Sequence, residues 1–268
     1  MFVYPEIDPV AIEIGPLQVR WYGLTYLFGF ITAWLLARYR ASRPESGWTP
    51  KQVDDFVTYG VLALILGARL GYVLFYGWDR LSQDPGFIYR IWEGGMSFHG
   101  GVLGILICAI IFARRQKRRL SEIGDFITPF AAPGLMFGRI GNFINAELWG
   151  RETTVPWAVV YPPELDPAGI ARHPSQLYEA FLEGLVLFLI LWFYSRKKRP
   201  AWAVTGVFLM GYGTFRFLVE FVREPDAHMG FIAFDWLTMG QLLSVPMVLF
   251  GAYLFFFGPG RSKDSLPA

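Results

Sequence analysis

Three arginines interrupt long apolar stretches of this sequence, and their chemistry is the first clue to function. Arg69, Arg139 and Arg216 each stand among residues that are mostly hydrophobic. A charged side chain inside a bilayer costs at least about 2.5–3.5 kcal/mol on insertion scales, so such arginines tend to face the interior of a helix bundle. A guanidinium fork binds phosphate through two parallel hydrogen bonds. These arginines therefore predict a binding site for a phospholipid headgroup.

Other polar residues are expected at the same depth. Arg139 and Asn142 are three residues apart and share a helix face, whereas Arg216 and Glu220 are four apart and can pair along their helix. Arg223, seven residues after Arg216, points the same way. The remaining polar residues near the outer ends of apolar stretches are Tyr22, His99, Glu147, His173 and Glu179. Because helices of opposite direction deliver these groups to one level, we expect a single polar site near the outer leaflet.

Structural interpretations of the same residues stay open. Arg69 alone also fits a structural salt bridge or a side chain that extends to the interface. His99 alone also fits a satisfied interfacial histidine. Cys108 lies mid-span in apolar company, where a thiolate is disfavoured, so we expect it to contribute only packing. Dispersed histidines argue against a zinc site, and the chain has no GxSxG, P-loop or dinucleotide-binding motif.

The composition indicates the environment in which these residues act. The chain has 268 residues, of which 54% are hydrophobic, 18% aromatic and 17% charged, and its mean hydropathy is +0.36. This composition excludes disordered, collagenous and coiled-coil proteins, and a single cysteine excludes a disulfide scaffold. A formal net charge of +2 argues against a nucleic-acid partner. An integral membrane protein is the class that fits best.

Run length predicts an all-α integral membrane protein with seven transmembrane helices, because a bilayer core needs about 20 apolar residues per helix. We expect one polytopic domain over residues 1–268, with a small head outside the membrane at about 146–175. The predicted spans are 21–39, 56–76, 95–113, 126–143, 176–194, 203–222 and 236–257. Pairs of small residues such as Gly67/Gly71, Gly100/Gly104 and Gly134/Gly138 predict close helix approach.

The distribution of basic residues predicts the orientation. Clusters of arginine and lysine fall in alternate loops, including RRQKRR at 114–119 and RKKR at 196–199, and Arg261 and Lys263 follow the last span. Basic loops stay on the cytoplasmic side, so the N-terminus is expected outside and the C-terminus inside.

Six stretches of the sequence resemble prolipoprotein diacylglyceryl transferases. They are RWYGL (20–24), GARLGYVLFY (67–76), GGMSFHGGVLG (94–104), GRIGNFINAELWGR (138–151), RHPSQLYEA (172–180) and YGTFRFLVEFVREPDA (212–227). The resemblance covers essentially the whole chain in order. It implies a bacterial inner-membrane enzyme whose active site faces the periplasm. That enzyme moves the diacylglyceryl group of phosphatidylglycerol to the lipobox cysteine of a prolipoprotein signal peptide, forms a thioether and releases glycerol phosphate.

The resemblance also implies roles for individual residues. Arg139 and Arg216 would hold the headgroup phosphate and stabilise the charge that develops on it, and His99 is the best candidate base on pKa grounds. Glu147 and Glu220 would orient arginines or act as the base instead. Further lipid-binding residues are expected to be Asn142, Arg69, Tyr22 and Gly150, supported by Asn145, His173, Glu179 and Arg223. No metal or organic cofactor is expected.

A second interpretation uses the same arginines without catalysis. A transporter or scramblase for anionic lipids could use them as a headgroup filter, although a conduit usually has polar groups along its whole length. An intramembrane protease would need a Ser/His or paired-Asp constellation at membrane depth, and we find none in the sequence.

Overall fold

The computed structural model describes residues 1–259 except for residues 6, 16 and 226–229. Arg261 and Lys263, which entered the orientation prediction, lie outside the described residues. The chain divides into two compact units, one of Met1–Leu35 with Asp125–Ala268 and the other of Leu36–Gly124. Helix α1 (Trp21–Ala41) runs from the first unit into the second.

The smaller unit consists of two long helices and several short helical turns. Its elements are η1 (Pro44–Ser46), α2 (Pro50–Tyr76), α3 (Trp78–Gln83), η2 (Pro85–Tyr89), η3 (Ile91–Glu93) and α4 (Phe98–Arg115). α2 begins at a capping box formed by Thr49 and Gln52. α2 and α4 touch at Gly67 and Gly104, where an added Cβ would overlap the backbone of the other helix. This close approach confirms the prediction made from the spacing of small residues.

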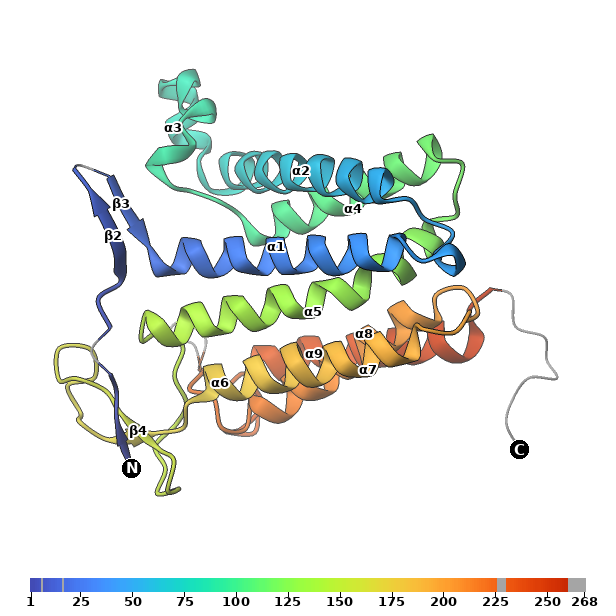
Figure 1. The fold of residues 1–268 in the computed structure, drawn as a ribbon. Helices are drawn as coiled ribbons and strands as arrows, with labels where there is room; N and C mark the ends of the chain where they lie inside the picture. The colour runs from blue at the N-terminus through green and yellow to red at the C-terminus, as the bar shows by residue number, and fades with distance from the viewer. Residues whose placement is uncertain (6, 16, 226–229, 260–268) are drawn as a thin grey trace, which may run out of the picture. The chain divides into compact units, whose positions relative to one another are not determined.

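Apart from α1, the other helices lie wholly or mainly in the larger unit (Figure 1). They are α5 (Leu120–Ile144), α6 (Ser175–Glu179), α7 (Leu187–Tyr194), α8 (Ala203–Val219) and α9 (Met239–Phe257). The π-helical segment η4 (Ala180–Val186) joins α6 to α7, so the chain is helical from Ser175 to Tyr194. Buried Ala132, Leu187, Leu191 and Val204 form the core between α5, α7 and α8. Gly29 of α1 packs closely on Gly134 of α5.

Short strands accompany the helices, which the prediction of an all-α protein did not include. They are β1 (Phe2–Val3), β2 (Val10–Ile14), β3 (Leu17–Arg20), β4 (Val159–Val160) and β5 (Ala171–Arg172). β1 pairs in parallel with β4, β4 pairs antiparallel with β5, and β2 and β3 form a separate antiparallel hairpin. β4 and β5 belong to the segment 146–175 that was predicted to form a head.

Tyr4 joins the first strand to the end of α5. Its hydroxyl donates to the backbone oxygens of Phe143, at 3.1 Å, and Ile144, at 2.6 Å. These carbonyls belong to the last turn of α5, where that of Phe143 also accepts the Ala146 N–H at 3.0 Å. The Tyr4 ring packs on Tyr161, with ring centroids 5.1 Å apart, in a small core that includes Val159. The end of α5 is thereby fixed to the head segment.

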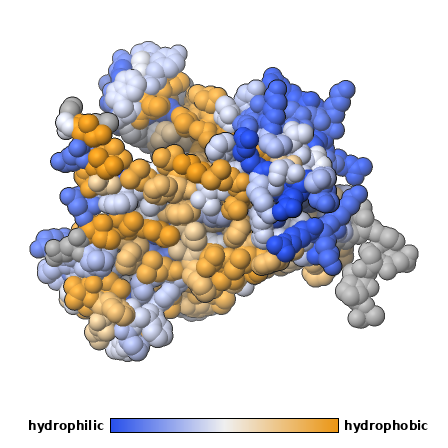
Figure 2. All heavy atoms as spheres, in the orientation of Figure 1, coloured by the Kyte–Doolittle hydropathy of each residue, from blue (hydrophilic) through white to orange (hydrophobic). Residues whose placement is uncertain are grey.

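The observed helices coincide with the predicted spans to within a few residues, except where α2 and α5 begin six residues earlier than predicted. Within the described residues, four helical segments are long and apolar enough to cross a bilayer: α2, α4, Ser175–Tyr194 and α9. α8 is a shorter apolar helix. Hydrophobic residues cover most of the visible helix faces (Figure 2), and Leu62, Leu66, Leu70 and Leu74 form an exposed stripe along α2. The fold is therefore that of a mostly helical membrane protein, and the number of seven spans stays a prediction.

Candidate functional site

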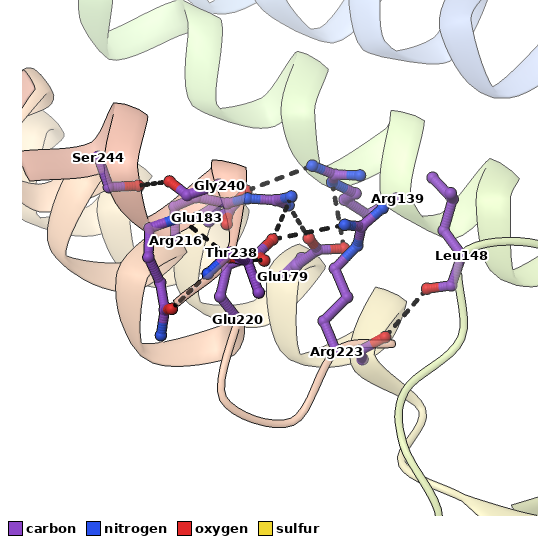
Figure 3. A network of polar contacts seen from close by, with 12 residues as sticks. Arg139, Leu148, Glu179, Glu183, Arg216, Glu220, Arg223, Thr238, Gly240 and Ser244 are labelled. Atoms are coloured by element: carbon purple, nitrogen blue, oxygen red, sulfur yellow. Dashed lines mark hydrogen bonds and ion pairs between the residues drawn. The ribbon is translucent and has the colours of Figure 1, made fainter. Parts of the chain in front are cut away.

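Two of the three arginines in apolar segments meet at one buried carboxylate. Arg139 lies on α5 and Arg216 on α8, and both contact Glu179 at the end of α6 (Figure 3). The Arg139 Nε lies 3.4 Å from Glu179 Oε2, and the Arg216 Nη1 pairs with Glu179 Oε1. Arg139 Nη2 also lies 3.8 Å from an oxygen of Glu183 in η4. Segments of opposite direction thus deliver charged groups to one level, as the sequence predicted.

Glu220 extends this cluster to the end of α8. Its Oε1 lies 2.5 Å from Arg216 Nη2, which confirms the pairing predicted from their spacing, and 3.4 Å from Arg223 Nη1. Its Oε2 accepts a 2.5 Å hydrogen bond from the hydroxyl of Thr238, the N-cap of α9. Gly240 packs directly against the Glu220 carboxyl group, where an added Cβ would overlap it. Glu220 is therefore held from three directions.

The cluster is balanced in charge but unevenly exposed. Its members are Arg139, Arg216, Arg223, Glu179, Glu183 and Glu220, so its formal charge is zero when all are ionised. The side chains of Glu179 and Glu183 are completely buried, whereas those of Arg139 and Arg216 are 18% and 15% exposed. Among the described residues, Arg139 forms ion pairs at 3.4 and 3.8 Å but no hydrogen bond. Its guanidinium therefore has N–H groups available to an anion.

A second set of polar residues gathers around Asn142, about one turn after Arg139 on α5. The Asn142 side chain donates to Glu147 Oε1 at 2.8 Å and also interacts with Tyr22. The Tyr22 hydroxyl lies 3.1 Å from that of Tyr26 on the same helix. The Gln176 side chain donates to the backbone oxygen of Glu147 at 2.7 Å. The structure thus brings together Tyr22, Asn142 and Glu147, as the sequence predicted.

Gly150 and His173 contribute mainly through the backbone. The Gly150 N–H donates to the His173 oxygen at 2.8 Å, and Gly150 forms an isolated bridge with Arg223. A Cβ at Gly150 would lie 2.6 Å from His173 and from the oxygen of Val222. Gly150 thus has a backbone-packing role, and its predicted lipid contact stays a prediction. His173 Nδ1 lies 3.1 Å from the Tyr178 hydroxyl, and burial lowers the pKa of His173.

Asn145 lies at the end of α5, where its backbone N–H donates to Gly141 at 3.0 Å. This bond continues the helix by one residue beyond Ile144. A supporting role for the Asn145 side chain stays a prediction.

Arg69 makes structural contacts in the smaller unit, and the lipid-binding role expected of it stays a prediction. Its guanidinium is buried and donates to five backbone carbonyls, which use all of its N–H groups. The acceptors are Phe87, Ile88, Arg90, Gly94 and Gly95. The guanidinium also lies 4.4 Å from the centre of the Phe87 ring. Arg69 is therefore a structural residue that fixes the segment between α3 and α4, by contacts other than the salt bridge or snorkelling considered from sequence.

His99 occupies the first turn of α4 in the smaller unit and is exposed. Ser97 caps this helix by accepting from the Gly100 N–H. The His99 ring lies beside that of Phe98, with ring centroids 5.7 Å apart. The predicted grouping of His99 with the arginine cluster of the larger unit stays a prediction.

The sequence analysis did not predict three residues that contact the cluster: Glu183, Arg151 and Thr238. Glu183 has a signal, because it follows Glu179 by four residues within an apolar stretch. Arg151 has a weaker one, as the last residue of the GRIGNFINAELWGR block. Its side chain donates to the backbone oxygens of Glu220 and Arg223, at 3.1 and 3.0 Å. Thr238 has none, because its contact with Glu220 arises only when α8 and α9 pack.

Comparisons with known proteins agree with the resemblance of the sequence. A family model described as prolipoprotein diacylglyceryl transferase matches residues 9–257. Relatives called phosphatidylglycerol–prolipoprotein diacylglyceryl transferase include proteins from Oleidesulfovibrio alaskensis (56% identity over 99% of this chain and 98% of the relative) and Solidesulfovibrio magneticus (58%, over 95% and 96%). One from Pseudomonas putida is 53% identical over the full length of both chains. The chain belongs to the prolipoprotein diacylglyceryl transferase family.

Proposed function

We propose that this protein transfers the diacylglyceryl group of phosphatidylglycerol to the lipobox cysteine of prolipoproteins, the first step of bacterial lipoprotein maturation. The proposal is supported by full-length relatives at 53–58% identity that carry the name of this activity. The structural observation that carries it is the contact of both Arg139 and Arg216 with Glu179, which holds two partly exposed guanidinium groups side by side. Two adjacent guanidinium groups suit a phosphodiester headgroup.

The proposed topology has seven spans in the bacterial inner membrane. The spans are α1, α2, α4, α5, Ser175–Tyr194, α8 and α9. The N-terminus and the head face the periplasm, and the basic loops at 114–119 and 196–199 face the cytoplasm. In this orientation the arginine cluster opens toward the outer leaflet.

The proposed reaction is a displacement at carbon. The substrate cysteine, as thiolate, attacks the glyceryl carbon that carries the phosphate oxygen. A C–S bond forms, the C–O bond breaks with its electron pair going to oxygen, and glycerol phosphate leaves with one more negative charge. Arg139 and Arg216 stabilise this developing charge, and Asn142 donates a further hydrogen bond to the leaving group.

The thiol proton needs an acceptor in this reaction. A cysteine thiol has a pKa of about 8.5, so a base or a positive field assists its ionisation near neutral pH. His99 is the proposed base because a neutral imidazole nitrogen can accept the thiol proton. Glu147, which already accepts from Asn142, is the alternative. Tyr22 donates a hydrogen bond to the lipid or the peptide.

A direct assay tests the function. The purified protein is incubated with phosphatidylglycerol and a lipobox peptide, and the peptide mass is measured. A diacylglyceryl mass increase on the cysteine is expected, with none on the matched Cys→Ser peptide. The absence of any mass increase, together with lipid movement across reconstituted vesicles without headgroup cleavage, would instead identify a lipid transporter.

A further inference from the structure

Glu183 is a buried carboxyl group to which the proposed reaction assigns no task. Its side chain is completely buried, and neither of its oxygens accepts a hydrogen bond from any residue that the structure describes. The closest cationic contact is Arg139 Nη2, at 3.8 Å from Oε2. Next to it in sequence, Gly184 packs against Met136 of α5 so closely that a Cβ would overlap that side chain. Glu183 is thus enclosed and weakly compensated.

The groups that face Glu183 come from each of the packed elements. They are Arg139 of α5, Glu179 of α6, Tyr212 and Arg216 of α8, and Glu220 at the end of α8. Figure 3 shows Glu183 within this network of charged side chains. The other two carboxylates are better compensated, because Glu179 contacts two arginines and Glu220 contacts two arginines and the Thr238 hydroxyl. Of the three carboxylates, Glu183 loses the least electrostatic stabilisation when it accepts a proton.

Charge balance makes this difference important when a lipid binds. The ionised cluster has three arginines and three glutamates, so a phosphodiester placed on Arg139 and Arg216 gives it an excess negative charge. A negative excess inside a protein at membrane depth is costly, and protonating one carboxylate removes it. Protonation of Glu183 also ends its attraction for Arg139, whose N–H groups then turn to the phosphate.

We propose that Glu183 takes up a proton when the headgroup phosphate binds to Arg139. The proposal rests on the proposed function for its choice of lipid. One proton comes from solvent for each lipid bound and forms an O–H bond on the Glu183 carboxyl group, and no bond of the lipid breaks in this step. Lipid affinity therefore weakens as pH rises above the value at which Glu183 ionises in the empty site, by about tenfold per pH unit.

Calorimetry on the unmodified full-length protein tests the proton uptake. Phosphatidylglycerol is titrated into the detergent-solubilised protein in two buffers of the same pH but different ionisation enthalpy. The difference in apparent binding enthalpy gives the number of protons taken up, expected to be about one per lipid on the alkaline side of the titration. No proton uptake between about pH 6 and about pH 9 would overturn the proposal.

Two variants assign the proton. Glu183→Gln mimics the protonated carboxyl group, so its lipid affinity is expected to lose the pH dependence and its binding to take up no proton. Glu164→Gln, an exposed position in the head segment, provides the matched control and is expected to behave like the unmodified protein. Undiminished uptake by a folded Glu183→Gln protein would overturn the assignment and direct attention to Glu179, Glu220 or Tyr212.

The outcomes also separate this proposal from the proposed function. Proton-coupled lipid binding without diacylglyceryl transfer to the peptide would contradict the proposed function and support proton uptake by Glu183. Transfer to the peptide with proton-independent lipid binding would contradict proton uptake by Glu183 and support the proposed function.

Discussion

The hydroxyl of Thr238 donates a 2.5 Å hydrogen bond to Glu220, and this bond joins the first turn of α9 to the end of α8. The same hydroxyl accepts the Gln241 N–H at 3.2 Å, so one oxygen both caps a helix and orients a carboxylate of the arginine cluster. Through Glu220, α9 helps to position the Arg216 guanidinium, which Glu179 holds from α6.

Replacing Thr238 by valine is expected to lower kcat for lipid transfer. The substitution keeps the shape of the side chain but leaves Glu220 Oε2 without its donor and the Gln241 N–H without its acceptor. A hydrogen bond to a charged group contributes about 1.5–3 kcal/mol, which corresponds to roughly a 10- to 100-fold loss of rate if the whole effect falls on catalysis. Thr238→Ser is expected to recover most of the activity. Ser244→Ala removes a hydroxyl from the same helix that donates only to Gly240, so it serves as the control. Wild-type kcat in Thr238→Val would contradict the positioning role.

Arg139→Lys is expected to reduce transfer by about two to three orders of magnitude. Lysine keeps the charge but lacks the planar fork that binds two phosphate oxygens. Initial rates at several phosphatidylglycerol concentrations measure the loss, and thermal unfolding shows whether the variant is folded. Arg80→Lys, at an exposed ion pair with Glu93, is the matched control and is expected to retain full activity. A folded Arg139→Lys protein with normal transfer would remove Arg139 from the headgroup site.

Arg69→Met is expected to destabilise the protein without changing its affinity for lipid. The substitution leaves five backbone carbonyls without their donor, and the expected loss is at least about 3 kcal/mol in the free energy of unfolding. A decrease in Tm with an unchanged KM for phosphatidylglycerol is the predicted result. The opposite pattern, an increased KM at an unchanged Tm, would restore the headgroup role for Arg69.

Acid is expected to weaken the head segment through Asp166. This buried carboxylate pairs with Arg172 at 2.5 Å, and the side-chain hydrogen bond from Arg172 lowers the pKa of Asp166 below its ordinary value of 3.8. A group whose pKa is lower in the folded state stabilises the protein above its ordinary pKa, and this contribution disappears as pH falls through the lowered value. The Tm of Asp166→Asn is therefore expected to decrease less than that of the unmodified protein when pH falls from about 6 to about 3. Equal losses in the two proteins would contradict the prediction.

Spacing along single helices predicted part of the site directly. Arg216 and Glu220 pair as four-residue spacing requires, and Asn142 follows Arg139 on the same helix. The level at which Glu179 meets Arg139 also followed from sequence, because the predicted ends of the spans bring them to the same depth. These relations depend on helix geometry, which a sequence pattern specifies well.

The contacts that depend on tertiary packing could not be predicted from the sequence. The five acceptors of Arg69 are backbone carbonyls of an irregular segment, and carbonyl direction leaves no mark on residue type. The role of Thr238 depends on how α8 and α9 pack. Glu183 was missed for a different reason: one glutamate within an apolar stretch has little effect on the mean hydropathy that defines a span.

The π-helical segment Ala180–Val186 follows Glu179, contains Glu183 and precedes the core residues Leu187 and Leu191. Such a segment has one more residue in its turn than a regular α-helix requires, and each residue turns an α-helix by about 100°. Deleting one residue here would leave a segment still long enough to cross a bilayer. Because the extra residue is absorbed within this segment, deleting it would close the turn to a regular α-helix and keep Glu179 and Leu187 on their present faces. A deletion in the α-helical part between Leu187 and Tyr194 would instead rotate the residues on its two sides by about 100° relative to each other. The helix should therefore tolerate a one-residue deletion within Ala180–Val186 better than one in Leu187–Tyr194.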